Sequence, residues 1–366
     1  MKHETYTLAY DSVHVGTQET AISYFDTIEE ITTVLSAYSG NTLFVTDETV
    51  ADLHSMKSFI KSIDPQNILI LPSGESYKTI EQVLRILSAA VERNLNRSSL
   101  FVGIGGGVIT DMTSFASSLF KRGCKLCLVP TTLLAMADAS IGGKTGCDFS
   151  GYKNTIGTFY PASSLLMSPG FLQSLSEKEY FSGLAEVVKT AMLYAPKLFN
   201  ILRDDFEAVQ KRDSTVLMQI IKRCAQSKAM IVEKDLTEKG MRKQLNLGHT
   251  FGHALESVAG LGSITHGEAV AWGLGRAIEL SFKLGHCEEE YKNDVLSLLD
   301  QYTWCINPVH PVCKTQGIKD APLKILEAMK QDKKNNEQGI TVILQREINS
   351  TLIEVVSETD ILSVLS

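Results

Sequence analysis

Three of the eight histidines of this chain stand close together in two neighbouring motifs. His249 and His253, in NLGHTFGHALE, are four residues apart and would lie on one face of a helix. His266 follows in ITHGEAVAWG at the predicted start of another helix, and Glu186 lies in the amphipathic segment SGLAEVVKT. Two histidines and one carboxylate leave a coordination position open, which is the arrangement of a catalytic rather than a structural zinc site. The sequence predicts a divalent-metal site, and the spacing leaves open which two histidines bind.

A glycine-rich turn predicts a phosphate site. The run LFVGIGGGVITD ends a predicted strand at Gly103, Gly105, Gly106 and Gly107 and then opens a helix. Glycine lets backbone N–H groups approach a phosphate, and a helix N-terminus favours its charge, although such a turn is also common as a tight connection. Asp47, at the end of the predicted strand TLFVTD, would accept from ribose hydroxyls and repel a 2′-phosphate, which favours NAD over NADP. The alternative for Asp47 is an ordinary helix N-cap.

Cations and amides near these motifs would suit an anionic substrate. A single lysine is most often a solvated surface charge, but here several stand around the glycine and histidine motifs. A polar turn, LPSGESYKT, also follows a predicted strand and carries Glu75 and Lys78. The candidates for anion binding are Lys144, Lys153 and Asn154 in the glycine-rich loop SIGGKTGCDFSGYKNTIG, Arg242 and Asn246 in KGMRKQLN, and Arg122, Lys228, Lys333 and Lys334.

The elements that must position these residues change character along the chain. The first half alternates short apolar runs, predicted as buried strands, with amphipathic helical segments, which indicates a parallel sheet covered by helices. The second half is predicted to be helical, with one alternating stretch that reads as a small hairpin. We expect two domains, 1–173 and 174–366, with a binding cleft between them. The strands are predicted at 41–47, 67–73, 99–107 and 124–132, the helices at 76–94, 108–122, 179–194, 213–234 and 243–258, and the hairpin at 339–356.

Composition excludes several other classes of protein. The net charge of −7 and the pI near 5.7 argue against a nucleic-acid partner. No run approaches eighteen uninterrupted apolar residues, and the first residues lack the apolar core of a signal peptide, so we expect no membrane span. Seven scattered cysteines fit reduced thiols and a cytoplasmic location. Cys124 and Cys127 have redox-motif spacing, but they lie in a predicted strand and are interpreted as core residues.

Taken together, the motifs resemble those of the 3-dehydroquinate synthases. GGGVITD, PTTLLAMADASIGGKT, the KN of GYKNTIG, SGLAEVVKT, LNLGHTFGHALE and HGEAVA carry the resemblance, which runs from about residue 74 to 344. It implies a Rossmann-like α/β amino-terminal domain, a mainly α-helical carboxy-terminal domain and a homodimer. It also implies NAD and Zn²⁺ or Co²⁺ as cofactors. The implied reaction converts 3-deoxy-D-arabino-heptulosonate 7-phosphate into 3-dehydroquinate and phosphate in the shikimate pathway, without net oxidation.

The resemblance also implies roles for individual residues. The metal ligands would be Glu186, His249 and His266. The NAD contacts would be Asp47, Ser73, Gly74, Glu75, Ser76, Tyr77, Lys78, Gly106, Gly107, Val108, Ile109, Thr110, Asp111, Thr131, Thr132, Lys144, Lys153, Phe171, Leu172, Gln173 and Ser174. The substrate contacts would be Asp138, Lys144, Asn154, Lys189, Lys228, Arg242, Asn246, His253 and Lys334 or its neighbour Lys333, while Arg122 would reach the phosphate site of the partner subunit.

This chain departs from the family pattern at four places, and other functions compete with the first. Thr110 stands where the family usually has glycine, Ser174 replaces a threonine, Pro161 and Ala162 replace a Gln-Pro pair, and the stretch DLTEKG lacks the common acidic-basic cluster. The first alternative is another sugar-phosphate cyclase that makes a valiolone or inosose product. A metal-dependent polyol dehydrogenase would release NADH and need no phosphate-binding residues, and a non-enzymatic NAD sensor would need no metal ligands.

Overall fold

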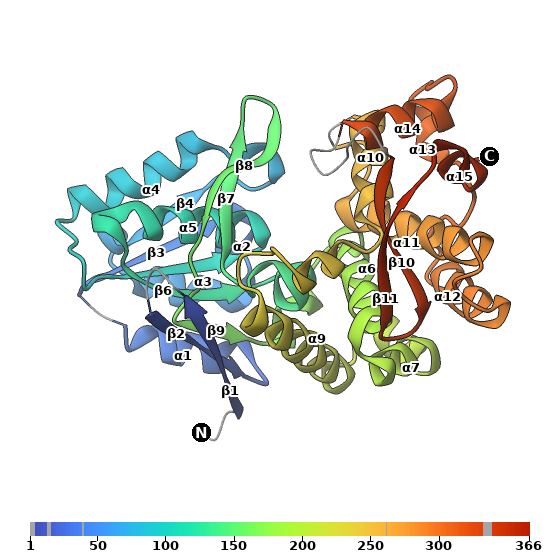
Figure 1. Ribbon diagram of the computed structural model, residues 1–366. Helices are drawn as coiled ribbons and strands as arrows, with labels where there is room; N and C mark the ends of the chain where they lie inside the picture. The colour runs from blue at the N-terminus through green and yellow to red at the C-terminus, as the bar shows by residue number, and fades with distance from the viewer. Residues whose placement is uncertain (1–3, 13–15, 39, 261, 332–338) are drawn as a thin grey trace. The chain divides into compact units, whose positions relative to one another are not determined.

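The computed structural model describes residues 4–12, 16–38, 40–260, 262–331 and 339–366. The chain forms two compact units, Met1–Ser176 with Lys211–Lys239 and Glu177–Gln210 with Gly240–Ser366. These are called the first and second units below (Figure 1). No helix among the described residues is long and apolar enough to cross a membrane.

The first unit is built on a seven-stranded sheet with the order β1-β2-β9-β6-β5-β3-β4. Only the β1–β2 pair is antiparallel among the pairings described, and the remaining neighbours run parallel. The four predicted strands are confirmed as β3 to β6. The apolar runs of β3, β5 and β6 are read easily because these parallel strands are buried on both faces, whereas β4 lies at the edge of the sheet and is partly exposed. The strands are β1 (Glu4–Ser12), β2 (Gly16–Tyr24), β3 (Thr42–Asp47), β4 (Ile68–Leu71), β5 (Leu100–Gly105), β6 (Lys125–Pro130) and β9 (Ser164–Met167).

The chain reverses its winding direction next to β3. From β3 it moves outward to β4, then returns to β5 on the other side of β3 and continues through β6 to β9. Such a reversal opens a crevice at the carboxyl ends of the two strands that flank it, here β3 and β5. The helices of this sheet layer are α1 (Ile28–Ser36), α2 (Glu48–Ala51), α3 (His54–Ser62), α4 (Ile80–Glu92) and α5 (Gly107–Leu119). Shorter helical turns are Pro65–Asn67, Glu75–Tyr77, Phe120–Arg122, Ala135–Ala139 and Pro169–Gln173.

The segment predicted as a glycine-rich loop is instead an antiparallel hairpin, β7 (Lys144–Phe149) and β8 (Tyr152–Phe159). Gly146 and Gly157 face each other across the hairpin, and a Cβ atom at Gly146 would lie 2.5 Å from the carbonyl oxygen of Ile156. These glycines therefore serve close backbone approach rather than a loop, a distinction that composition does not reveal.

Helix α9 (Ser214–Lys234) belongs to the first unit although it follows the first helices of the second unit in the chain. It packs against β1 and against the turns Ala135–Ala139 and Pro169–Gln173. The sequence-based division at residues 173 and 174 assigned this helix to the second domain. An amphipathic pattern predicts a helix but does not indicate which layer its apolar face will cover.

The second unit is helical with one small sheet, as predicted. Its core surrounds α11 and contains Phe251, Leu255, Trp272, Ile325 and Leu344. The helices are α6 (Glu177–Tyr194), α7 (Pro196–Asp204), α8 (Phe206–Gln210), α10 (His249–Ala259), α11 (His266–Lys283), α12 (Glu289–Gln301), α13 (Pro311–Thr315), α14 (Ala321–Lys330) and α15 (Glu358–Ser363). The predicted hairpin is formed by β10 (Ile340–Glu347) and β11 (Ser350–Val356), seen in red in Figure 1.

The segment 243–258, predicted as one helix, is broken in the structure. A 3₁₀ turn covers Met241–Asn246, and α10 begins only at His249. Gly248 separates them with a φ of +76°, a left-handed conformation that favours glycine. A Cβ atom at Gly248 would also lie 2.9 Å from the backbone nitrogen of Leu274 in α11. The break therefore places His249 at the first turn of α10, against α11.

Candidate functional site

Glu186, His249 and His266 converge in the second unit. The Glu186 Oε1 atom lies 3.1 Å from His266 Nε2 and 3.5 Å from His249 Nε2. The three potential ligand atoms all lie within 4.8 Å of one another. The carboxylate comes from the middle of α6, and the imidazoles come from the first residues of α10 and α11. One carboxylate and two imidazoles around a common point form the donor set of an open zinc or cobalt site, so these residues fit such an ion.

The far nitrogen of each imidazole ring is held by an oxygen acceptor. His249 Nδ1 lies 3.1 Å from the Leu247 carbonyl oxygen, and His266 Nδ1 lies 3.3 Å from Glu256 Oε2. An acceptor at Nδ1 keeps the ring proton there and leaves the Nε2 lone pair for a metal. Both rings therefore present Nε2 toward Glu186. This arrangement is the one that metal-binding histidines generally adopt.

Backbone contacts at glycine positions bring the three helices together. A Cβ atom at Gly267 of α11 would lie 2.5 Å from the carbonyl carbon of Ser182 in α6, and the Ser182 hydroxyl accepts a hydrogen bond from the Gly267 amide. A Cβ atom at Gly252 of α10 would lie 2.9 Å from the carbonyl oxygen of Ala269 in α11. The missing side chains thus allow α6, α10 and α11 to touch close to all three ligands.

The electrostatics of the cluster suit a cation. Burial would raise the pKa of the Glu186 carboxyl, but Lys189, which forms an ion pair with Oε2, and the two histidines hold it well below its usual range. Burial and the nearby Lys189 charge lower the pKa of His249, which keeps that ring neutral. Burial would also lower the pKa of His266, but hydrogen bonds to Glu186 and Glu256 raise it to about 9. A metal ion would therefore replace a proton at His266.

A second group of potential ligands shares one histidine with the first. His253, Glu256 and His266 also have ligand atoms within 4.8 Å of one another. The His253 ring is exposed and lies 5.1 Å from the His249 ring and 5.8 Å from the His266 ring, measured between centroids. Nearby in the chain, Arg242 is buried, and Asn246 donates to the Lys243 carbonyl oxygen.

In the first unit, Asp47 and the glycine turn end the two strands that flank the winding reversal. Glycine is required there, because a Cβ atom at Gly105 would lie 2.6 Å from Ile109 and one at Gly106 would lie 2.9 Å from Thr132. The backbone can therefore approach a phosphate at the start of α5, as the sequence indicated. Asp47 Oδ1 accepts from the Val50 amide at 2.9 Å, so this residue is the N-cap of α2, and burial raises the pKa of its carboxyl.

A buried ion pair joins the polar turn to α5. Lys78 Nζ lies 2.6 Å from Asp111 Oδ2 and donates to Asn154 Oδ1 at the same distance. Burial would lower the pKa of the Lys78 ammonium, but Asp111 and Glu75 raise it above its usual value. Lys78 stays charged and links Asp111, a predicted NAD contact, to Asn154, a predicted substrate contact. Spacing along the chain did not indicate this contact.

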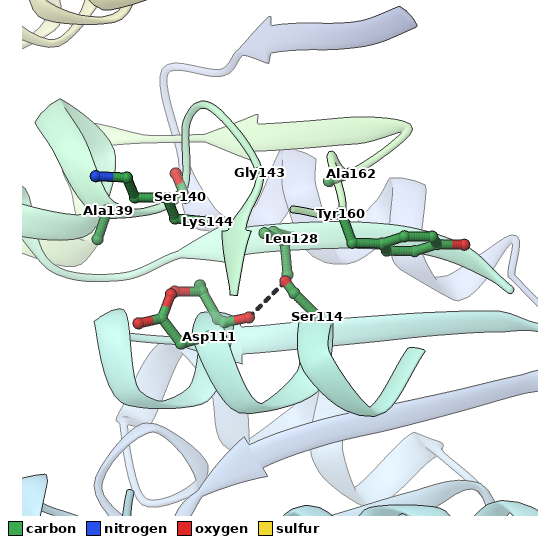
Figure 2. Close-up of a pocket in the computed structure, with 10 residues that line it drawn as sticks. Asp111, Ser114, Leu128, Ala139, Ser140, Gly143, Lys144, Tyr160 and Ala162 are labelled. Carbon is green, nitrogen blue, oxygen red and sulfur yellow. Dashed lines mark hydrogen bonds between the residues drawn. The ribbon is translucent and has the colours of Figure 1, made fainter. Parts of the chain in front are cut away.

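Thr110 is the departure from the family pattern in the glycine turn. Its side chain is buried, and its hydroxyl donates to the Gly107 carbonyl oxygen at 3.1 Å. It lines a small pocket with Asp111 and Lys144, two other predicted site residues. Figure 2 shows this pocket, with Asp111 and Lys144 toward one end and Tyr160 toward the other.

The remaining predicted residues of the first unit lie around these features. Lys228 Nζ lies 2.6 Å from Asp138 Oδ1, which belongs to the π-helical turn Ala135–Ala139, and Lys144 forms an ion pair with Glu238. Thr131 and Thr132 follow β6 beside the glycine turn, and Thr131 donates its amide to the Gly105 carbonyl. The predicted residues Ser73 to Lys78 follow β4, and Phe171 to Ser174 form a turn whose Leu172 carbonyl accepts from the Arg212 guanidinium. Lys153 lies on β8, Arg122 is exposed, and Lys333 and Lys334 lie outside the described residues.

Two acidic residues that the sequence reasoning did not single out stand beside predicted ones. Glu256 contacts His266, and Glu238 pairs with Lys144. Glu256 stands seven residues after His249, so helical spacing places both on one face of α10 and was a usable signal. Glu238 had no such signal. It lies in a loop, where its own φ is +59°, and it contacts Lys144 on β7, more than ninety positions earlier in the chain.

The family models and relatives agree on one class of enzyme. The model described as 3-dehydroquinate synthase N-terminal matches residues 68–182, and the model described as 3-dehydroquinate synthase C-terminal matches residues 183–335. The 3-dehydroquinate synthase of Shewanella halifaxensis is 38% identical over 306 residues, which cover 83% of each chain.

Solved structures share the fold. The 2-epi-5-epi-valiolone synthase from Streptomyces hygroscopicus subsp. jinggangensis, with NAD⁺ and Zn²⁺ bound, matches with a TM-score of 0.83 at 27% identity and covers 94% of this chain and 95% of its own. A 2-deoxy-scyllo-inosose synthase complexed with carbaglucose-6-phosphate, NAD⁺ and Co²⁺ matches with a TM-score of 0.83 at 22% identity, covering 99% of both chains. Because its sequence identity is only 22%, the match to the 2-deoxy-scyllo-inosose synthase is evidence for the fold alone.

Proposed function

Because the chain belongs to the 3-dehydroquinate synthase family, we propose that it converts 3-deoxy-D-arabino-heptulosonate 7-phosphate into 3-dehydroquinate and phosphate. The observation that carries this proposal is the convergence of Glu186, His249 and His266 on one point, with both imidazoles presenting Nε2. A divalent metal there would act as a Lewis acid toward the substrate hydroxyls. Lys189 would hold the ligand Glu186 in place through its ion pair with Oε2.

NAD is proposed to bind at the winding reversal of the sheet. The amides at the start of α5 would hold its pyrophosphate, and the Asp47 carboxylate would accept from a ribose hydroxyl. When bound, NAD would take up a hydride and return it, so no net oxidation results. Lys78 supports this assignment because its buried ammonium fixes Asp111 in the first turns of α5. We include in this proposal the other NAD contacts that the family resemblance implies.

The anionic groups of the substrate are proposed to bind the predicted cationic and amide residues. Lys144, Lys228 and Asn154 of the first unit are already paired with Glu238, Asp138 and Lys78 respectively. These pairings hold the side chains in fixed positions before the substrate binds. They support a role in which the side chains bind a substrate phosphate or carboxylate without rearranging. Arg242, Asn246, Lys189 and His253 are the proposed contacts of the second unit.

Arg122 is proposed to serve the phosphate site of a partner subunit in a homodimer. The residues Lys121, Arg122 and Gly123 follow one another with φ values of +51°, +66° and +114°. Two non-glycine residues in the left-handed region are costly, and such strain is retained where the side chain must be held in one place. This conformation supports a role for the exposed Arg122 side chain beyond that of a surface charge.

A polyol dehydrogenase remains the competing function, and a different sugar-phosphate cyclase is the second. The experiment that separates them supplies the purified enzyme with NAD, Zn²⁺ and one of three substrates: the heptulosonate phosphate, a heptulose phosphate without the carboxylate, or a polyol. We expect 3-dehydroquinate and phosphate from the first substrate only. A carbocycle formed from the heptulose phosphate, or oxidation of the polyol, would contradict the proposal.

A further inference from the structure

Glu256 is a mostly buried carboxylate beside the metal-type cluster. Its residue is 9% exposed, and its Oε2 atom lies 3.3 Å from His266 Nδ1. It lies on α10, on the same helical face as His249. The proposed function gives Glu256 no place among the metal ligands or the substrate contacts.

His266 stands between two carboxylates, one on each ring nitrogen. Nε2 faces Glu186 Oε1 at 3.1 Å, and Nδ1 faces Glu256 Oε2 at 3.3 Å. A neutral imidazole carries its single proton on one of the two ring nitrogens, so a metal can bind only the other nitrogen. The carboxylate that accepts from the ring therefore decides which nitrogen is offered to the metal.

Two ligand sets compete for this histidine. One consists of Glu186, His249 and His266, and the other of His253, Glu256 and His266. The side chains of Glu186 and His249 are only 1% and 12% exposed, and Glu186 is further fixed by Lys189, whereas His253 is exposed. A carboxylate that holds the Nδ1 proton cannot at the same time bind a metal together with Nδ1. Glu256 can therefore hold the Nδ1 proton of His266 or bind a metal together with Nδ1, but it cannot do both.

We propose that Glu256 is a positioning residue that holds the Nδ1–H of His266, so that Nε2 binds the metal in the Glu186–His249–His266 set. This inference rests on the proposed function, because it concerns the same metal. Glu256 also disfavours the alternative set by occupying Nδ1. The Leu247 carbonyl does the same for His249, but it belongs to the backbone, so Glu256 is the partner that a substitution can remove.

The test measures metal binding in the full chain, stripped of metal and titrated with Zn²⁺ and with Co²⁺ against a chromophoric chelator. Glu256→Gln keeps the size and an acceptor oxygen but removes the charge, and Glu256→Leu removes both. The matched control is Glu354→Gln, whose carboxylate contacts His286 Nε2 at 2.6 Å in the same unit and touches no proposed ligand. Losing an orienting partner generally weakens metal binding about 10- to 100-fold.

We expect Glu256→Leu to raise the metal Kd within that range, Glu256→Gln to raise it less, and Glu354→Gln to leave it unchanged. The visible spectrum of the Co²⁺ form should change in Glu256→Leu, which a purely structural role would not cause. Wild-type Kd and spectrum in both Glu256 variants would overturn the inference. So would two metal ions per wild-type chain with one lost in Glu256→Leu and in His253→Ala, because Glu256 would then be a ligand. A wild-type chain that binds no metal would overturn the proposed function as well.

Discussion

Substituting Gly267 by alanine should damage the metal site through helix spacing alone. The new Cβ atom would lie 2.5 Å from the Ser182 carbonyl carbon and closer still to its oxygen, whereas carbon atoms in contact prefer about 3.5–4.0 Å. Helices α6 and α11 must therefore separate by about 1 Å. Metal–ligand distances tolerate only about 0.2 Å, so Glu186 and His266 could no longer bind one ion together.

The expected effect on stability is smaller than the effect on metal binding. Overpacking costs about 1–3 kcal/mol, and the higher helix propensity of alanine offsets about 1 kcal/mol of that cost. We therefore expect Gly267→Ala to lower the free energy of unfolding of the metal-free protein by about 0–2 kcal/mol. Its metal Kd should rise at least about tenfold, the loss seen when even an orienting partner is removed.

Gly275 of the same helix provides the matched control. A Cβ atom there would lie 3.6 Å from Leu299 and 3.8 Å from Leu296, which are ordinary contacts. Gly275→Ala should keep the wild-type metal Kd and gain up to about 1 kcal/mol of stability. The assays are chelator competition for Zn²⁺ and unfolding of the metal-free proteins. A Gly267→Ala protein that binds Zn²⁺ as tightly as Gly275→Ala would refute the link between helix spacing and ligand geometry.

Four further predictions follow from the same features. His249→Ala should lose the metal and the activity while it keeps the fold, and full metal occupancy with normal turnover would remove His249 from the ligand set. NADP should replace NAD poorly because Asp47 would face the 2′-phosphate, and equal activation at matched concentrations would leave Asp47 only its role as N-cap. The pKa of His266 in the metal-free protein is raised to about 9, so its proton is bound at neutral pH and must leave when the metal binds. Zn²⁺ affinity should then rise between pH 6.5 and 8.5, and a flat profile in a calorimetric titration would contradict this reasoning. Arg122→Ala should weaken substrate use about ten- to a hundredfold, since a charge-assisted contact contributes about 1.5–3 kcal/mol. Mixing it with Lys144→Ala should restore activity if Arg122 acts in the partner subunit, and no recovery despite proven subunit exchange would exclude that role.

The parts of the fold that the sequence predicted are those with the strongest hydrophobic signal. Strands β3, β5 and β6 are buried along nearly their whole length, so their residues form continuous apolar runs. Strand β8 is exposed at nearly every residue, and its glycines suggested a loop. Strands β1 and β2 mix polar and apolar residues and were not predicted. Strand β1 pairs with the neighbouring β2, but β2 also pairs in parallel with β9, which lies far along the chain.

The candidate site was likewise predictable from the sequence only where a local pattern marks its residues. Helical spacing located His249 and His253 on one face of α10, and the motif ITHGEAVAWG located His266 at the start of the next helix. The choice among them needed the packing of α6 against α11 at Gly267 and the acceptors on each Nδ1 atom. The contact between α6 and α11 joins residues eighty-five positions apart, and no local pattern encodes it.

The central claim is that this enzyme uses NAD and a metal to release phosphate without net oxidation. The most direct measurement counts phosphate released per NAD, with NAD far below the heptulosonate phosphate, while NADH absorbance is followed in metal-loaded and metal-stripped enzyme. We predict many phosphates per NAD, no accumulation of NADH, and loss of turnover on stripping that added Zn²⁺ or Co²⁺ restores. One NADH per turnover, or phosphate release that metal removal does not affect, would contradict the claim.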